Sequence, residues 1–218
     1  MVETATGEAL LEVKDLKTYF PTDEGLVKAV DGISFAIKPG ETLGVVGESG
    51  CGKSTVGRSI LQILDRPGYV EEGSMLWRTD SLDGGVETVV DVAKEKPNSR
   101  TMRMIRGNDI ALVFQEPMTS FSPVHTIGNQ MTEMIRLHRD VSKKEAKNLS
   151  IELLQSVGIP NPEQRVNEYS FQLSGGLRQR AMIAMALSCD PKLLIADEPT
   201  TALDVTTQAQ ILDLLRKL

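Results

Sequence analysis

The sequence has few cysteines and no long hydrophobic run. Its 218 residues include two cysteines, Cys51 and Cys189, too few for a disulfide framework or a four-ligand zinc site. The longest nearly apolar run, 181–189, has nine residues, whereas about 18 are needed to span a bilayer. Residues 1–4 show no basic stretch leading into an apolar one, so no secretory signal is predicted. These absences favour a soluble protein of a reducing compartment.

An excess of basic residues is also lacking. Lys and Arg number 24 against 30 Asp and Glu, which gives a formal net charge of -6. This mild acidity argues against a surface that coats nucleic acid, and no nucleic-acid partner is predicted. The remaining composition, 40% hydrophobic and 25% charged, is that of a globular protein and excludes disorder, collagen and coiled coil. The length predicts one large domain, or one domain with a subdomain.

Short apolar runs alternate with amphipathic segments. Strands are predicted at 10–20, 27–37, 42–46, 73–77, 110–114 and 193–196, and the third, fifth and sixth of these are predicted to be buried. Helices are predicted directly after residue 54 and at 130–137, 143–157, 174–189 and 207–218. The polar stretch 78–100 is predicted to be an exposed excursion, in part poorly ordered. This alternation predicts an α/β core on a mostly parallel sheet, with a helical block between 117 and 173.

Residues 47–54 match the pattern G-x-x-x-x-G-K-[ST], between a predicted strand and a predicted helix. Glycines let the backbone curl so that its N–H groups face phosphate oxygens, and the helix N-terminus adds partial positive charge. Lys53 supplies a full charge to the β and γ phosphates, and the Ser54 hydroxyl can hold Mg²⁺. The alternative is a glycine-rich turn that binds nothing. We predict a nucleoside triphosphate site formed by Gly47, Glu48, Ser49, Gly50, Cys51, Gly52, Lys53, Ser54 and Thr55.

Two carboxylates follow the predicted strand 193–196. A carboxylate at the end of a buried strand is costly unless a cation or hydrogen-bond donors satisfy it, and Mg²⁺ takes one or two carboxylates together with phosphate oxygens. Asp197 is therefore the predicted metal ligand. Glu198 is predicted to orient or deprotonate the attacking water; the alternative for Glu198 is a solvated charge at the end of a strand.

Residues 173–180, LSGGLRQR, resemble the LSGGQ signature of ATP-binding cassette (ABC) ATPases, with Leu177 in place of the common glutamine. Ser174, Gly175 and Gly176 open a helix and so form a second anion-binding N-terminus. The resemblance implies that two nucleotide-binding domains enclose two ATP molecules, each lending its signature to the other. The alternative for these residues is an ordinary helix cap followed by flexible glycines.

Further positions match the family one by one. Gln115 resembles the glutamine that contacts Mg²⁺ or the water and senses the membrane subunits. Asp204, in the segment 202–204, resembles the aspartate that reaches across the dimer. Tyr19 resembles the aromatic residue that stacks on adenine, with packing at a strand end as the alternative.

The resemblance extends to a subfamily. Segments 30–35, 114–120 and 179–187 are similar to dipeptide and oligopeptide importer ATPases, a group that includes nickel systems. It implies an ATPase that powers solute import, with ATP and Mg²⁺ as cofactors. The implied partners are a second ABC ATPase subunit, identical or different, and integral membrane permease subunits that dock on 115–134. The implied location is peripheral, on the cytoplasmic face of the inner membrane.

The resemblance also implies a domain plan. The fold class is a P-loop NTPase core with a mostly parallel sheet, an N-terminal antiparallel β subdomain and an inserted helical signature subdomain. The chain 1–218 is read as one ABC ATPase domain. Residues 10–115 hold the β subdomain and P-loop, 116–190 the helical subdomain, and 191–218 the Asp197 region, the Asp204 segment and the following helix.

The end of the chain departs from the family pattern, which places a switch-loop histidine after the last predicted helix. Fourteen residues follow Asp204 and none is histidine, while His125 and His138 precede the signature. We therefore expect an incomplete domain, a fragment rather than a natural truncation, that binds Mg-ATP better than it hydrolyses it. A soluble ABC ATPase acting on DNA or ribosomes is the alternative; it is disfavoured because no long heptad run is present and the balance is acidic.

Overall fold

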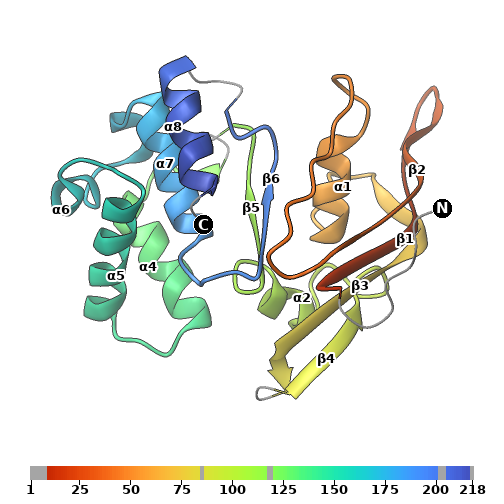
Figure 1. Cartoon of the computed structure of the whole chain (residues 1–218), viewed down its shortest axis with the longest axis horizontal. Helices are drawn as coiled ribbons and strands as arrows, with labels where there is room; N and C mark the ends of the chain where they lie inside the picture. The colour runs from red at the N-terminus through yellow and green to blue at the C-terminus, as the bar shows by residue number, and fades with distance from the viewer. Residues whose placement is uncertain (1–8, 84–85, 117–119, 201–204, 217–218) are drawn as a thin grey trace. The chain divides into compact units, whose positions relative to one another are not determined.

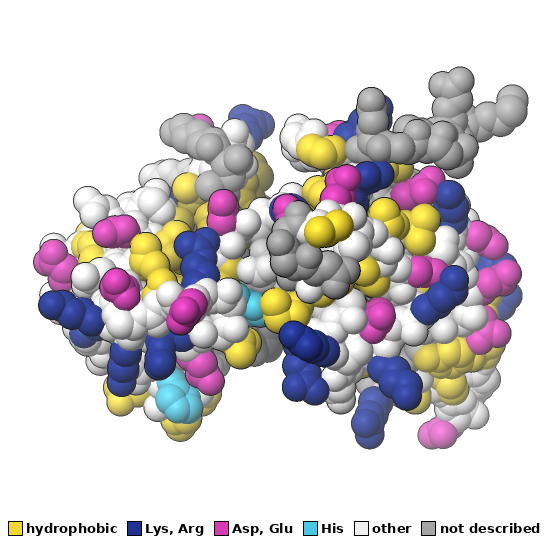
Figure 2. Space-filling model, turned by 90° about the horizontal axis from the view of Figure 1, so that it is seen from below, with side chains coloured by type: hydrophobic (Ala, Val, Ile, Leu, Met, Phe, Trp, Pro, Cys, Tyr) yellow, Lys and Arg dark blue, Asp and Glu magenta, His cyan; other side chains and the backbone are white. Residues whose placement is uncertain are grey.

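The computed structural model of the chain describes residues 9–83, 86–116, 120–200 and 205–216, and it divides into two units, Met1–Arg106 and Gly107–Leu218 (Figure 1). Acidic and basic side chains are interspersed over the face shown in Figure 2. Among the described residues, no helix has the length and apolar character that crossing a membrane requires.

The first unit is built on a four-stranded sheet in the order β2-β1-β3-β4. Strand β1 (Leu11–Thr22) pairs antiparallel with β2 (Gly25–Ile37) and with β3 (Tyr69–Asp83), and β3 pairs with β4 (Val86–Asp91). The predictions of strands at 10–20 and 27–37 are confirmed. Strand β1 has neighbours on both edges, which pair its backbone, and its apolar side chains Leu11, Val13 and Leu16 are buried.

The segment 78–100, predicted to be an exposed excursion that is poorly ordered in part, contains regular secondary structure, although most of its described residues are exposed or half-buried. Strand β3 has 15 residues and continues past Trp77 to Asp83, it forms a hairpin with β4, and helix α2 (Arg100–Ile105) follows, capped by the side chain of Ser99. Met75, Trp77 and Thr79 are all buried on one face of β3. The alternation of buried residues along β3 continues through Thr79, which is polar, so the composition of this segment is that of a loop although its structure is a strand.

The prediction of a buried strand at 42–46 is also wrong. The segment is irregular, and the side chains of Val45 and Val46 are 53% and 93% exposed. A strand is stabilised by ladder hydrogen bonds to a neighbour. No described strand of the first unit pairs with 42–46, and the parallel strands belong to the second unit.

The second unit combines a parallel strand pair with helices. Strands β5 (Ile110–Val113) and β6 (Leu193–Ala196) pair in parallel, Ile110 opposite Leu193. The helices are α4 (Ile127–His138), α5 (Lys143–Ser156), α6 (Pro162–Arg165), a 3-10 turn (Ser170–Gln172), α7 (Gly175–Ala186) and α8 (Val205–Arg216). They enclose a core that includes Val113, Ile127, Met131, Leu154, Ala181, Met182 and Ile183.

Most predictions for this unit are confirmed. Helices are present at 130–137, 143–157, 174–189 and 207–216, with ends that differ by a few residues, and β5 is buried. Strand β6 was predicted to be buried, and this is wrong: its side chains are half-buried or exposed. An apolar run of four residues predicts a strand but does not show how far other elements cover its side chains.

Candidate functional site

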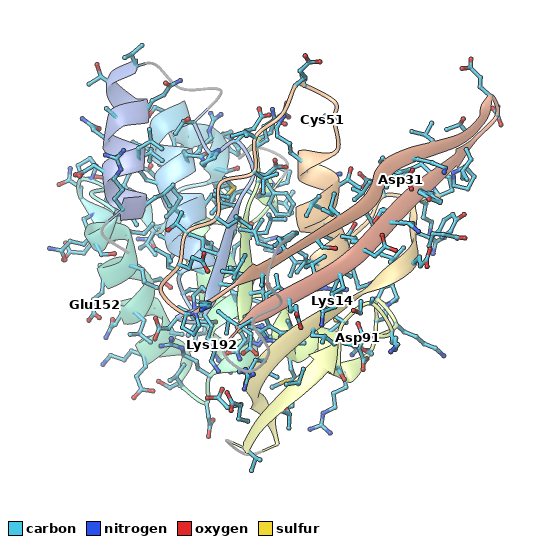
Figure 3. The ribbon with its side chains drawn as sticks, turned by 45° about the vertical axis from the view of Figure 1, so that its right-hand side comes forward. Lys14, Asp31, Cys51, Asp91, Glu152 and Lys192 are labelled. Atoms are coloured by element: carbon cyan, nitrogen blue, oxygen red, sulfur yellow. The ribbon has the colours of Figure 1, made fainter. Side chains whose placement is uncertain are left out.

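The loop before α1 (Lys53–Ile60) is shaped by glycines in conformations that other residues avoid. Gly50 and Gly52 have φ angles of 80° and 97°, in the left-handed region. A Cβ on Gly52 would collide with the carbonyl oxygen of Ala29 on β2, so the loop lies directly against that strand. Cys51 belongs to the same loop and is exposed (Figure 3).

The N-terminal end of α1 has no side-chain cap. Its N-cap residue, Gly52, supplies no side-chain hydrogen bond, although the first N–H groups of a helix need partners outside the helix. The Lys53 ammonium folds back over the loop and donates to the carbonyl oxygens of Gly47 (3.0 Å) and Glu48 (2.9 Å). The helix N-terminus and this cation together form a cradle for an anion such as phosphate.

In the second unit, Gln115 and Glu198 meet although they are 83 residues apart. Asp197 extends the β5–β6 ladder by donating its N–H to the Val113 carbonyl oxygen at 2.9 Å. The next residue, Glu198, has a φ of 45°, which turns the chain after the strand. The Gln115 side-chain amide then donates to the Glu198 carboxylate at 2.8 Å. The sequence predicted roles for both residues but not this hydrogen bond.

The signature residues lie at the start of α7. The Ser174 hydroxyl accepts from the Leu177 N–H at 3.4 Å, as a helix N-cap does. A Cβ on Gly175 would meet open space, so this N-terminus is unobstructed. Arg178 donates to the Ser170 carbonyl oxygen at 2.8 Å and holds the preceding turn. Ser174 is therefore an N-cap of α7, and there is space for a ligand beside Gly175.

Tyr19 and Phe20 lie on opposite faces of β1. The Thr18 hydroxyl contacts the Ser59 hydroxyl of α1 at 2.9 Å, so Thr18 faces α1. Neighbouring residues of a strand point to opposite faces, which separates the Tyr19 and Phe20 side chains, and the pairing of β1 is irregular between Thr18 and Tyr19. The half-buried Phe20 ring lies against Gly68, and Phe20 pairs with Val27, two residues before Ala29.

Tyr19 contacts two neighbouring residues of β2. Its side chain is 7% exposed, its hydroxyl donates to the Asp31 carboxylate at 2.7 Å, and the Lys28 ammonium lies 5.3 Å from its ring centre. The hydrogen bond to Asp31, aided by burial, raises the pKa of Tyr19 to about 12, and the same bond lowers the pKa of Asp31. This arrangement does not support stacking of Tyr19 on adenine. Sequence reasoning overlooked Phe20, its neighbour; the only available signal was that two aromatic residues are adjacent.

Some predicted positions lie outside the described residues. These are Asp204 and the part of the predicted docking region at 117–119. The remainder of that region leads into α4, whose N-cap Thr126 accepts from the Asn129 N–H.

Known proteins are similar to this chain over most of its length. Residues 30–201 match the family model described as ABC transporter. A putative peptide import ATP-binding protein of Brucella melitensis is 51% identical over 97% of this chain and 61% of its own length. The oligopeptide transport ATP-binding protein AppD of Bacillus subtilis is 50% identical over 96% of this chain and 60% of its own length. The chain thus spans about three fifths of these relatives.

Solved structures are similar as well. A dimeric ATP-binding cassette in a post-hydrolysis state, bound to ADP and Pi, superposes with a TM-score of 0.77 at 27% identity and covers 95% of this chain and 82% of that one. The family match covers well over half of the chain, and the P-loop, the Gln115–Glu198 pair and the signature helix all lie within it. The chain belongs to the ABC transporter family.

Proposed function

We propose that this chain binds and hydrolyses ATP as the ATP-binding subunit of a peptide importer. The observation that carries the proposal is the anion cradle at α1: a glycine loop, an uncapped helix N-terminus and the Lys53 ammonium held over the loop by two carbonyl oxygens. Identities near 50% to proteins named for peptide or oligopeptide import support the choice of solute.

Each unit holds oxygen donors of the kind that Mg²⁺ prefers. In the first unit this donor is the Ser54 hydroxyl, and in the second unit the donors are the Asp197 carboxylate and the side-chain carbonyl oxygen of Gln115. Among the described residues, no three His, Cys, Asp or Glu side chains gather into a metal cluster. Mg²⁺ usually combines one or two protein ligands with substrate phosphates, and when bound it neutralises phosphate charge.

Glu198 is the proposed general base, and Gln115 is proposed to orient it. Accepting the Gln115 amide hydrogen on one oxygen, Oε2, fixes the carboxylate in one orientation. A carboxylate held in this way can act as a base toward water. In the proposed reaction Glu198 accepts the proton and Gln115 orients Glu198.

The proposed assembly contains a second ATPase subunit and a permease. The open N-terminus of α7, with Ser174, Gly175 and Gly176, is proposed to bind the γ-phosphate of ATP held by the partner subunit, and Asp204 to reach across the dimer. The dimeric state of the similar solved cassette supports this. The permease is proposed to dock on 115–134, at the cytoplasmic face of the membrane, and no nucleic acid takes part.

The proposed function is tested by titrating the chain with Mg-ATP, Mg-ADP and AMP in a calorimeter, followed by a phosphate-release assay. AMP is the matched control because it lacks the β and γ phosphates that Lys53 would contact. We expect ATP to bind at least about tenfold more tightly than AMP, the scale of one charge-assisted hydrogen bond. Equal affinities for ATP and AMP would contradict the binding of the β and γ phosphates by the P-loop. Uptake of a labelled tripeptide into proteoliposomes tests the solute.

Adenine is proposed to stack on Phe20. We expect Phe20→Ala to raise the Kd of ATP by about tenfold, since base–aromatic stacking contributes roughly 1–3 kcal/mol. Tyr19→Phe keeps a ring on the adjacent residue and removes only the bond to Asp31, so it should leave the affinity unchanged. Calorimetric titration of Phe20→Ala and Tyr19→Phe measures both affinities. An unchanged Kd in Phe20→Ala would contradict stacking on Phe20.

A further inference from the structure

The C-terminal end of α1 is held by an arginine from another element. The last carbonyl groups of a helix have no partner within the helix. Here Arg106, directly after α2, donates from Nε to the Leu61 carbonyl oxygen at 2.6 Å and from Nη2 to the Gln62 carbonyl oxygen at 3.0 Å. The planar fork of a guanidinium suits two such acceptors in a way that a lysine ammonium does not.

The contact is made by a partly buried cation. Burial lowers the pKa of Arg106 by removing water from its charged form, and its hydrogen bonds run to backbone carbonyl oxygens. A cation at this end of a helix is favourable, because the helix dipole places partial negative charge there. The same dipole places partial positive charge at the other end of α1, where the phosphate cradle lies.

Helix α1 is short enough for one end to set the direction of the other. It has eight residues, a length of about 12 Å at 1.5 Å per residue. The Thr18–Ser59 hydrogen bond holds it against β1, and the Gln62 side chain donates to the Val92 carbonyl oxygen at 3.0 Å. Arg106 is the charged anchor at this end. Without it, α1 can tilt about its contact with β1, and a shift of about 1 Å at the phosphates is costly.

We propose that Arg106 is a positioning residue for nucleotide binding: its guanidinium holds the C-terminal end of α1 and so aims the N-terminal end of that helix at the phosphates. The inference rests on the proposed function of the P-loop, and it adds a residue that does not touch the nucleotide. The two carbonyl oxygens that its guanidinium contacts, those of Leu61 and Gln62, lie within the first unit.

The test compares Arg106→Ala, Arg106→Lys and the control Arg103→Ala by calorimetric titration with Mg-ATP. Arg103 lies on α2 and also donates from Nε and Nη2, but to the Asn98 carbonyl oxygen, and it is exposed. We expect Arg106→Ala to raise the Kd by about tenfold, which corresponds to one charge-assisted hydrogen bond. Arg106→Lys keeps the charge without the fork and should recover part of the loss. Arg103→Ala should bind like the unaltered chain.

A second readout separates positioning from loss of stability. Titrations are made well below the unfolding midpoint of each variant, and hydrogen exchange is measured on α1. We expect faster exchange in α1 for Arg106→Ala than for Arg103→Ala, together with the weaker Kd. An unchanged Kd in both Arg106 variants, or a lower unfolding midpoint with an unchanged Kd, would overturn the inference. If Arg106→Ala does not fold, Arg106→Lys decides.

Lys53→Ala distinguishes failure of this inference from failure of the proposed function. If the unaltered chain binds Mg-ATP, Lys53→Ala loses binding and both Arg106 variants bind normally, the P-loop stands and the role of Arg106 is wrong. If Lys53→Ala binds as well as the unaltered chain, the proposed function and this inference fail together.

Discussion

Glu198→Gln is expected to lower the kcat of ATP hydrolysis by about 10²–10⁴-fold, the range of a general base. The amide cannot accept the proton of the attacking water, but it has the same shape, and its oxygen can still accept the Gln115 amide hydrogen seen at Glu198. Binding should therefore persist, with a Kd for ATP within about threefold of the unaltered chain. Steady-state phosphate release and calorimetric titration measure the two quantities.

The matched control is Glu152→Gln. Glu152 is exposed on α5, in the same unit as Glu198 (Figure 3), and the same change there should leave turnover unaltered. Normal turnover in Glu198→Gln would mean that Glu198 is a solvated charge at the end of a strand. Equal losses in both variants would mean that the assay responds to a general effect of removing a carboxylate.

Lys53→Ala is expected to raise the Kd of Mg-ATP by about 10²-fold. The ammonium, which rests on the Gly47 and Glu48 carbonyl oxygens, would donate to the β and γ phosphates instead. Two charge-assisted hydrogen bonds, each of about 1.5–3 kcal/mol, support a loss of this size even after the exchange with the loop carbonyls. AMP binding should change little, because AMP lacks both phosphates. Calorimetric titration with both nucleotides measures the difference.

Lys143→Ala controls for the loss of a lysine at a helix start. Lys143 is the first residue of α5, as Lys53 is of α1, and its side chain is exposed. It follows the side-chain cap Ser142, whereas Lys53 follows a glycine loop. We expect Lys143→Ala to bind ATP normally. A similar loss in both variants would assign the effect to net charge rather than to the P-loop.

Functional motifs were predictable from the sequence where a short segment dictates its own conformation. The P-loop is such a case, since Gly50 and Gly52 adopt left-handed conformations and Lys53 follows them directly. The helix that begins after Ser174 is another, because the cap lies within three residues of its acceptor. These features depend on neighbours in sequence, so residue types and spacing carry the information.

Features that depend on distant partners were not predictable. The strand predicted at 42–46 needs a ladder neighbour, and an apolar run does not show whether one exists. The hairpin of β3 and β4 shows the reverse: residues 78 and 79 lie in a polar stretch, but they form a strand because they pair with Val89 and Thr88. The contact of Thr18 with Ser59, 41 residues away, depends on the fold in the same way.

The single tryptophan of the chain allows the two units to be observed separately. Trp77 is fully buried on β3 in the first unit, so its fluorescence reports the unfolding of that unit. The longer helices, α4, α5, α7 and α8, belong to the second unit and dominate the far-ultraviolet circular dichroism. Melting curves that coincide in the two signals would mean that the ATP cradle and the signature helix unfold as one cooperative block. Separate midpoints would mean that the half of the chain that holds the phosphates has a thermal stability of its own, which nucleotide could raise selectively.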